Sequence, residues 1–274
     1  MPRSHSVSIT LGDGGRLSVH RRDIAKDAVI MAMLPEAPRN IFEASAGRAQ
    51  LAQRLRDKGY ELTVSNYDLE ENLPIPQIKL DLNARNGRLP GAPFDAVICR
   101  EVIEHVESVP HVLRFFREQL ADDGVLILSF PNRLTFRSRL YHLLTGFYRG
   151  MPSPINLSHY LGLEHINLIG YPEMDYFLRK TGYAVEEVRT SEIAPLDHLC
   201  LTAWPFIWLA TTYFLLFHKK RREGHEKDSP PEIRKNRFIR DRLLSRALFL
   251  GKDVIIKARR LPDGSADSGV PPHC

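Results

Sequence analysis

Cysteine is scarce in this 274-residue chain, which has three, at Cys99, Cys200 and Cys274. They are too widely spaced to form the patterns that hold a disulfide framework or a structural metal. We therefore expect a protein of a reducing compartment. The N-terminal segment MPRSHSVSIT also lacks an apolar run, so no secretory signal peptide is predicted.

Charge is unevenly distributed along the chain. The formal net charge is +5, but residues 219–246 alone carry eleven Lys and Arg against five Asp and Glu. A concentrated basic segment predicts one anionic partner surface, either lipid headgroups or nucleic acid. With 43% hydrophobic residues, the chain is also long enough to bury one full core.

The segment Asn40–Asp68 has the order of a strand, a tight turn, a helix and a second strand. An apolar run ends at Glu43, a turn of small residues follows at Ala44–Gly47, and the second strand, Leu62–Tyr67, is followed by Asp68. A βαβ unit of this kind opens many nucleotide-binding sheets. Small residues let a ligand approach the helix N-terminus, and an acid after the second strand lies where a ribose diol is usually bound.

Strand-like and helix-like segments alternate along most of the remaining chain. Helices are predicted at Arg21–Leu34, Val109–Leu120 and Pro172–Lys180, with a basic helix at Asn132–Phe147, and strands at 77–82, 94–99, 125–130, 183–189 and 252–258. This alternation predicts an α/β, Rossmann-like fold, in which a seven-stranded, mostly parallel sheet has helices on both faces.

We divide the chain into five parts on this basis. Residues 1–37 are a hairpin and leading helix, 38–190 the core, and 191–250 an apolar and basic helical insertion before the last strand. The last strand occupies residues 251–260, and 261–274 form a tail that is rich in Pro, Gly, Ser and Asp and is predicted to be disordered.

Residues 94–132, FDAVICREVIEHVESVPHVLRFFREQLADDGVLILSFPN, closely resemble the class I S-adenosylmethionine-dependent methyltransferases. They are most similar to the group that contains the quinone-biosynthesis O-methyltransferases. The strand, the EVIEHV element, the helix, the D-D-G turn and the LILSFPN strand follow in family order. The resemblance extends over about residues 38–190 and the last strand. It implies a methyltransferase that uses S-adenosylmethionine.

The resemblance also implies roles for individual residues. Glu43–Gly47 match the family's E-x-G-x-G cofactor turn, with Ser45 at the first glycine position and Ala49 at a later one. A Cβ at a positive φ angle costs on the order of 1 kcal/mol, so these two residues are expected to affect cofactor affinity.

Further cofactor contacts follow from the same resemblance. Asp68 matches the acid that binds the ribose hydroxyls, Asp81 and Leu82 match the pair beside the adenine, and Arg100 falls at the cofactor side of the next strand. The alternative interpretation is that these acids merely cap the ends of strands.

The motif E-x-x-E-H holds Glu101, Glu104 and His105. One helical turn would place all three on one face. In several similar enzymes such a cluster binds a divalent cation such as Mg²⁺, and small-RNA 2′-O-methyltransferases add a downstream histidine, comparable to His165. Alternatively, His105 acts alone as a general base, since histidine exchanges protons near neutral pH. A third possibility is that Glu104 and His105 only orient a loop.

The insertion contains Leu199–Phe217, nineteen residues without a charge, which is nearly long enough to span a bilayer. Because the last strand must return to the same sheet, both ends of the insertion lie on one side. A re-entrant hairpin bent at Pro205, or an interfacial helix, meets that condition. Trp204 and Trp208 suit a headgroup boundary. The alternative is a buried core helix or a dimer contact.

A basic amphipathic helix is predicted over 234–249. We therefore expect residues 199–249 to bind an anionic membrane surface, with the protein in the cytoplasm and peripherally attached to the inner face of the membrane. The expected function is O-methylation of a lipid-borne or amphiphilic acceptor. The alternatives are an RNA 2′-O-methyltransferase, disfavoured because no RNA-binding module is present, and a non-catalytic scaffold with a degenerate cofactor site.

Overall fold

The computed structural model describes residues 6–10, 14–36, 39–70, 73, 75–84, 87–148, 165–215 and 230–263, without the side chains of 230–233 and 235. Parts of four predicted segments lie outside the described residues: residue 13 of the hairpin turn predicted at 13–15, the end of the uncharged stretch at 216–217, the first part of the basic segment at 219–229, and the tail from 264 onward.

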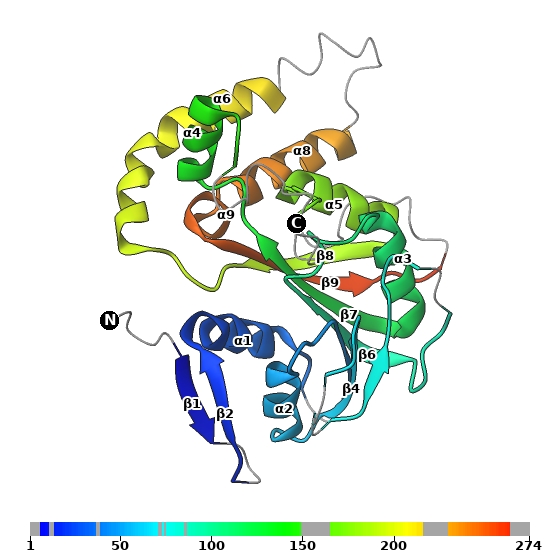
Figure 1. The fold of residues 1–274 in the computed structure, drawn as a ribbon. Helices are drawn as coiled ribbons and strands as arrows, with labels where there is room; N and C mark the ends of the chain where they lie inside the picture. The colour runs from blue at the N-terminus through cyan, green and yellow to red at the C-terminus, as the bar shows by residue number, and fades with distance from the viewer. Residues whose placement is uncertain are drawn as a thin grey trace.

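A seven-stranded sheet forms the centre of the molecule, in the order β5-β4-β3-β6-β7-β9-β8 (Figure 1). Its strands are β3 (Asn40–Ala44), β4 (Glu61–Asn66), β5 (Gln77–Lys79), β6 (Phe94–Arg100), β7 (Leu120–Pro131), β8 (Tyr183–Arg189) and β9 (Asp253–Arg260). Strands β3 to β7 pair in parallel, whereas β9 runs antiparallel between β7 and β8. The predicted Rossmann-like, mostly parallel sheet is confirmed.

Helices cover both faces of this sheet. Helices α1 (Arg21–Met33) and α2 (Gln50–Arg56) pack on one face, and α3 (Val109–Gln119) and α5 (Tyr171–Lys180) pack on the other. Successive residues of a strand point to opposite faces, so Ile41 contacts the first pair of helices and Phe42 the second. Because β3, β6 and β7 are covered on both sides, they are continuous apolar runs.

The order of the strands places a ligand crevice at one edge of the sheet. From β3 the chain moves outward to β4 and β5, and it then crosses to β6 on the other side of β3. In open α/β sheets ligands bind beyond the carboxyl ends of the strands at such a reversal. The residues that follow β3 and β6 therefore have the position of an active site.

A buried carboxylate fixes α1 against this edge. Asp27 is fully buried, and it accepts a hydrogen bond at 2.7 Å from Arg54 of α2 and another at 2.7 Å from Arg100 of β6. Burial raises the pKa of Asp27, and the two guanidiniums only partly oppose that effect. Ahead of α1, β1 (Ser6–Thr10) and β2 (Arg16–His20) form an antiparallel hairpin.

The remaining helices lie beyond the carboxyl end of β7 (Figure 1). They are α4 (Phe136–Thr145), the 3₁₀ helix η1 (Pro195–Ala203), α6 (Trp204–Tyr213), α8 (Pro230–Leu243) and α9 (Arg246–Leu250). None of the helices in the described part of the chain has the length and hydrophobicity of a transmembrane span.

The predicted continuous basic helix over 234–249 is wrong in one respect. Ser245 interrupts it and caps α9 by accepting a hydrogen bond from the backbone N–H of Leu248. Leu244, Leu248 and Phe249 are buried, so these apolar side chains fill the protein interior instead of facing a membrane.

The two tryptophans of α6 are also partly internal. Trp204 donates a hydrogen bond from Nε1 to the carbonyl of Leu244 at 2.9 Å, and the guanidinium of Arg240 lies 5.3 Å from the centre of the Trp208 ring. Both rings therefore join α6 to α8 and its continuation.

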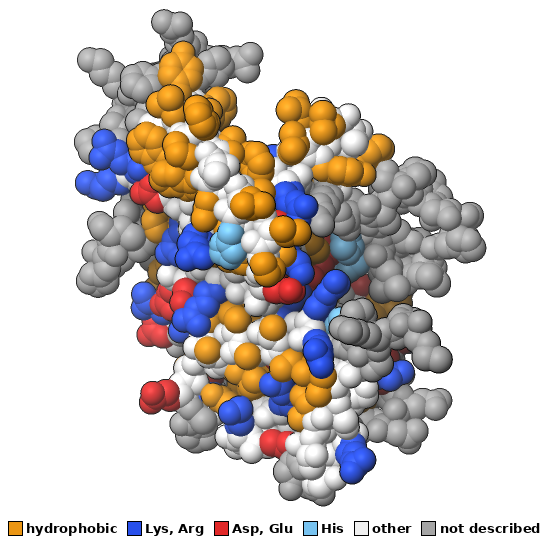
Figure 2. All heavy atoms as spheres, turned by 90° about the vertical axis from the view of Figure 1, so that its left-hand side faces the viewer, with side chains coloured by type: hydrophobic (Ala, Val, Ile, Leu, Met, Phe, Trp, Pro, Cys, Tyr) orange, Lys and Arg blue, Asp and Glu red, His pale blue; other side chains and the backbone are white. Residues whose placement is uncertain are grey.

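The predicted basic helix at 132–147 is instead apolar on its outer side. Arg137 pairs with Asp197 at 2.8 Å while its side chain stays 45% exposed, and Arg139 donates from Nε to the carbonyl of Leu134. The side chains that face outward are large and apolar: Leu140, Tyr141, Leu143, Leu144 and Phe147. Figure 2 shows hydrophobic side chains gathered over the upper part of the molecule, with Lys and Arg side chains below them.

The buried Asp27 generates a stability prediction. We expect Asp27→Asn to lower the free energy of unfolding by about 3 kcal/mol, because the Arg54 and Arg100 guanidiniums would stay largely buried without the carboxylate that they both pair with. Urea unfolding followed by circular dichroism would measure the loss. The control is Asp122→Asn, which removes an exposed carboxylate 3.3 Å from Arg260 and should cost less than about 1 kcal/mol. Equal losses in the two variants would contradict the role given to Asp27.

Candidate active site

The turn after β3 has an unusual backbone conformation. Ser45, Gly47 and Ala49 have φ angles of 52°, 54° and 49°. A residue with a Cβ adopts this left-handed region at a cost of about 1 kcal/mol. Ser45 and Ala49 thus occupy glycine-type positions, as the E-x-G-x-G comparison predicted, and the backbone keeps the glycine conformation despite the substitutions.

The side chain of Asn66 holds this turn, a role that the sequence analysis missed. Its Oδ1 accepts from the Gly47 N–H at 2.6 Å, and its Nδ2 donates to the Gly47 carbonyl at 3.0 Å. The available signal was a polar residue at the carboxyl end of the second strand of the βαβ unit. Asp68, the predicted ribose-binding acid, lies two residues beyond β4, where its side chain is 83% exposed and 3.7 Å from the Nζ of Lys79.

The turn leaves open space on its outer side. A Cβ built on Gly47 would meet no atom within 4 Å, so a ligand has room to approach the backbone here. Asp81 and Leu82, predicted beside the adenine, follow β5: Asp81 accepts from the Asn83 N–H at 2.9 Å, and Leu82 is buried in the core. The open turn fits a nucleoside-bearing cofactor.

Beneath the turn lies a buried carboxylate, Glu43. Burial raises the pKa of Glu43 to about 7, with the Arg100 guanidinium opposing this shift and the Asp27 carboxylate adding to it. Its Oε2 has no hydrogen-bond partner among the described residues. Arg100 comes from the end of β6 and is directed to Asp27 at 2.7 Å. The two residues predicted to contact the cofactor are therefore next to each other at the carboxyl edge.

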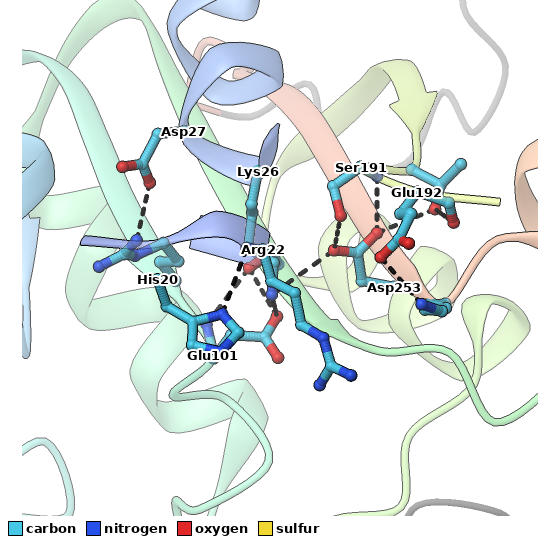
Figure 3. A network of polar contacts seen from close by, with 12 residues as sticks. His20, Arg22, Lys26, Asp27, Glu101, Ser191, Glu192 and Asp253 are labelled. Atoms are coloured by element: carbon cyan, nitrogen blue, oxygen red, sulfur yellow. Dashed lines mark hydrogen bonds and ion pairs between the residues drawn. The ribbon is translucent and has the colours of Figure 1, made fainter. Parts of the chain in front are cut away.

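The predicted helical turn at the E-x-x-E-H motif is not formed. Glu101 has a φ angle of 52°, and residues 101–108 form turns. The carboxylate of Glu101 lies 2.9 Å from the Nζ of Lys26 and accepts from the Ser129 hydroxyl at 2.9 Å. Figure 3 shows Lys26 between Glu101 and Asp253, which lies 3.5 Å from the Nζ on its other side. These contacts direct the Glu101 carboxylate toward α1.

The other three residues of the predicted metal set do meet. Single donor atoms of Glu104, His105 and His165 lie within 4.8 Å of one another. The two imidazole rings pack edge to face at 4.8 Å, and the Nε2 of His105 is 4.0 Å from the Oε1 of Glu104. Asn167 fixes the segment after His165 by donating from its backbone to the Glu104 carbonyl at 2.9 Å and from its side chain to the Val106 carbonyl.

The surroundings of Glu104 and His165 favour the neutral form of each side chain. Burial, and then the nearby Glu101 carboxylate, raise the pKa of Glu104 to about 8. Burial and then the neighbouring His105 lower the pKa of His165.

A family model described as a methyltransferase domain matches residues 19–188. The chain belongs to this methyltransferase domain family. The match includes the turn, the E-x-x-E-H segment and α1, which carries Lys26 and Asp27. The expected enzyme class, an S-adenosylmethionine-dependent methyltransferase of class I, is confirmed, as is the expected cofactor.

Solved methyltransferases share the fold at low sequence identity. An S-adenosylmethionine-dependent methyltransferase of Archaeoglobus fulgidus is 14% identical, with a TM-score of 0.51 over 88% of this chain and 95% of that one. The 1,6-didemethyltoxoflavin-N1-methyltransferase of Burkholderia thailandensis, solved with S-adenosylhomocysteine, is 12% identical, with a TM-score of 0.49 over 88% and 78%. No curated protein matches the methyltransferase significantly.

Glu43 makes the stability of the methyltransferase depend on pH. The pKa of Glu43 rises from its ordinary value of 4.5 to about 7 in the folded chain. The stability that Glu43 contributes is therefore complete below pH 4.5 and is lost as the pH rises through 7. Relative to Glu43→Gln, we expect the wild-type free energy of unfolding to fall by about 3 kcal/mol over this range. Urea unfolding at stepped pH would measure it. For Glu118→Gln, an exposed change on α3, the difference in free energy of unfolding from the wild type should not vary with pH. A difference that is likewise independent of pH for Glu43→Gln would refute the pKa shift.

Proposed function

We propose that this methyltransferase transfers a methyl group to an oxygen of a lipid-borne or amphiphilic acceptor at a membrane surface. The observation that carries the proposal is the apolar surface of α4 and α6. Leu140, Leu143 and Leu144 follow the i, i+3, i+4 spacing of one helix face, yet this face is exposed, as is Phe147 just beyond the helix. The same holds for Phe206, Leu209 and Tyr213 of α6. Scattered exposed apolar residues are normal, but contiguous ones mark interaction sites.

The cofactor-binding role of the carboxyl edge is part of the proposal. When bound, S-adenosylmethionine supplies an already activated methyl group. The open backbone turn at Ser45–Ala49 would hold its amino-acid and ribose portion, with Asn66 or Asp68 near the ribose hydroxyls. Asp81 and Leu82 would border the adenine. Glu43 and Arg100 would set the charge beneath the turn, where a carboxylate that lacks a partner suits a cationic ligand.

We assign His105 as the general base for the acceptor hydroxyl. It follows β6 at the same edge as the cofactor turn, and Glu104 and His165 fix its surroundings. Removing the hydroxyl proton while the acceptor is aligned with the methyl group is the main chemical demand of the reaction. A competing role for Glu104, His105 and His165 is a site for a divalent cation, because carboxylate and imidazole atoms are suitable ligands.

The apolar surface lies close to the reaction edge, which favours a membrane-borne acceptor. Asp253, at the start of β9, accepts from the Ser191 hydroxyl and backbone N–H at 2.5 and 2.7 Å and lies 3.5 Å from Lys26. Ser191 precedes η1, and Arg137 joins α4 to η1 through Asp197. An acceptor held by α4 and α6 would thus rest on elements that are linked by contacts to Lys26, the ion-pair partner of Glu101. The proposal includes peripheral attachment on the cytoplasmic side.

Substitution of the proposed base tests the chemistry. We expect His105→Ala to lower the rate of methyl transfer on the order of 100-fold or more, because general base catalysis is lost. Its affinity for S-adenosylmethionine, measured by calorimetry, should stay within about twofold, because the cofactor turn is untouched. Transfer of a labelled methyl group into a lipid extract and an RNA extract would measure activity and acceptor class. Full activity in the variant, or label in RNA alone, would refute the proposal.

Chelation separates the base from the competing cation site. The wild-type enzyme, dialysed against EDTA, should keep its activity if His105 acts without a metal. Loss of activity that Mg²⁺ or Mn²⁺ restores would assign Glu104, His105 and His165 to a cation site instead. Asn167→Ala, which removes a contact to the Val106 carbonyl without removing a ligand, is the matched control for disturbance of the loop.

The apolar surface gives a second prediction. Leu143 and Leu144 are 80% and 74% exposed, so replacing both with serine should leave folding intact. We expect the double variant to bind phospholipid vesicles at least about tenfold more weakly, since burying a leucine contributes roughly 1.5 kcal/mol. Vesicle flotation would measure binding, with Tyr176→Ser on α5 as the control. Unchanged flotation of the double variant would remove the membrane role from α4.

A further inference from the structure

Arg139 is a guanidinium without a carboxylate partner. It lies on α4, where its Nε donates to the carbonyl of Leu134 at 2.8 Å. Among the described residues, no ion pair includes Arg139. Burial lowers its pKa, and Tyr148 is the neighbour that opposes this effect. Holding a partly buried cation without an anion is costly unless a ligand supplies the charge.

A second arginine and two rings accompany Arg139. The guanidinium of Arg133 lies 5.2 Å from the centre of the Tyr148 ring, and this ring stacks on His142 at 4.1 Å with an interplanar angle of 2°. Arg133 pairs with Glu173 at 2.6 Å through Nη2, but its buried Nε has no hydrogen-bond partner among the described residues. We call Arg133, Arg139, His142 and Tyr148 the α4 basic cluster.

The α4 basic cluster shares its helix with part of the apolar surface. Arg133 follows the end of β7 directly, and Arg139 folds back over the first turn of α4 to reach Leu134. The outer side of the same helix is the exposed apolar stripe at Leu140, Leu143 and Leu144. One amphiphile could therefore place hydrocarbon on the stripe and an anionic group on the cluster.

The donors of the α4 basic cluster suit a phosphoryl group. Two guanidiniums and a phenol offer several N–H and O–H donors, and arginine matches the oxygens of a phosphate with paired hydrogen bonds. Among the described contacts, Glu173 is the carboxylate at the cluster. It pairs with Arg133 and leaves the charge of Arg139 unneutralised.

We propose that the α4 basic cluster binds the phosphoryl group of an anionic lipid, so that the enzyme selects phosphate-bearing amphiphiles at the membrane. This inference rests on the proposed membrane-surface function. It adds a residue, Arg139, whose role is to recognise the lipid phosphate and not to take part in methyl transfer.

Vesicle binding tests this assignment. The probes are phosphatidylcholine vesicles with and without phosphatidic acid, and the proteins are wild type, Arg139→Gln and Arg114→Gln. Arg114 is an exposed arginine on α3, so its variant loses the same charge elsewhere. We expect phosphatidic acid to tighten wild-type binding, and Arg139→Gln to lose about fivefold of that gain. Arg114→Gln should keep the gain, and binding to neutral vesicles should not change.

The possible outcomes separate this inference from the proposed function. Failure of the wild type to bind any vesicle refutes the membrane proposal itself. Binding without a gain from phosphatidic acid, or equal losses in both variants, overturns the α4 basic cluster alone. Competition by inorganic phosphate without any vesicle preference would assign the cluster to a water-soluble phosphate and overturn the lipid assignment.

Stability supplies a readout that a merely structural arginine would not give. If Arg139 serves a ligand, Arg139→Gln should leave the free energy of unfolding of the ligand-free protein unchanged or higher, because an uncompensated cation is removed. A loss of stability, measured by urea unfolding, would show that Arg139 holds the fold and would overturn its assignment as a ligand-binding residue.

Discussion

The buried carboxylate of Asp27 is the contact on which the site depends. Through Arg54 and Arg100 it joins α1 to α2 and to β6, directly beneath the cofactor turn. Breaking such a contact leaves buried charges unpaired, which costs more than the intact contact contributes. The leading helix is therefore held in one position, and Lys26, the preceding residue, is directed to Glu101. One residue thereby influences both the floor of the cofactor site and the conformation of the E-x-x-E-H segment.

Much of the fold could be predicted because it follows from local periodicity. Apolar runs of strand length, separated by amphipathic segments, specify a wound parallel sheet, and β8 begins and ends at the predicted residues, Tyr183 and Arg189. The return of β9 to the sheet was also predictable. The interruption of the 234–249 helix was not, because it depends on the tertiary burial of Leu244 and Phe249. A pattern of alternating basic and apolar residues does not reveal which side faces the protein.

The candidate site shows the same division between local and distant causes. The left-handed turn at Ser45 and Ala49 could be predicted, because a motif position carries its backbone conformation with it. Asn66 could not, since its hydrogen bonds to Gly47 join segments that meet only in the folded sheet. Glu101 differs from prediction for a similar reason. Its carboxylate pairs with Lys26, a residue that is distant in the sequence and comes near only in the folded chain.

Helix α4 combines two features that each cost free energy in the folded protein. Its outer stripe exposes large apolar side chains, and its inner side keeps a guanidinium away from any described carboxylate. Folding alone would favour the reverse orientation, with leucines inside and arginines in solvent. The helix is nevertheless held as observed by Arg137 on Asp197 and by Phe136 against Phe249. An amphiphile with an anionic group would satisfy both faces at once, because one molecule would cover the stripe and neutralise the cation. The two features are therefore better explained by a shared ligand than separately.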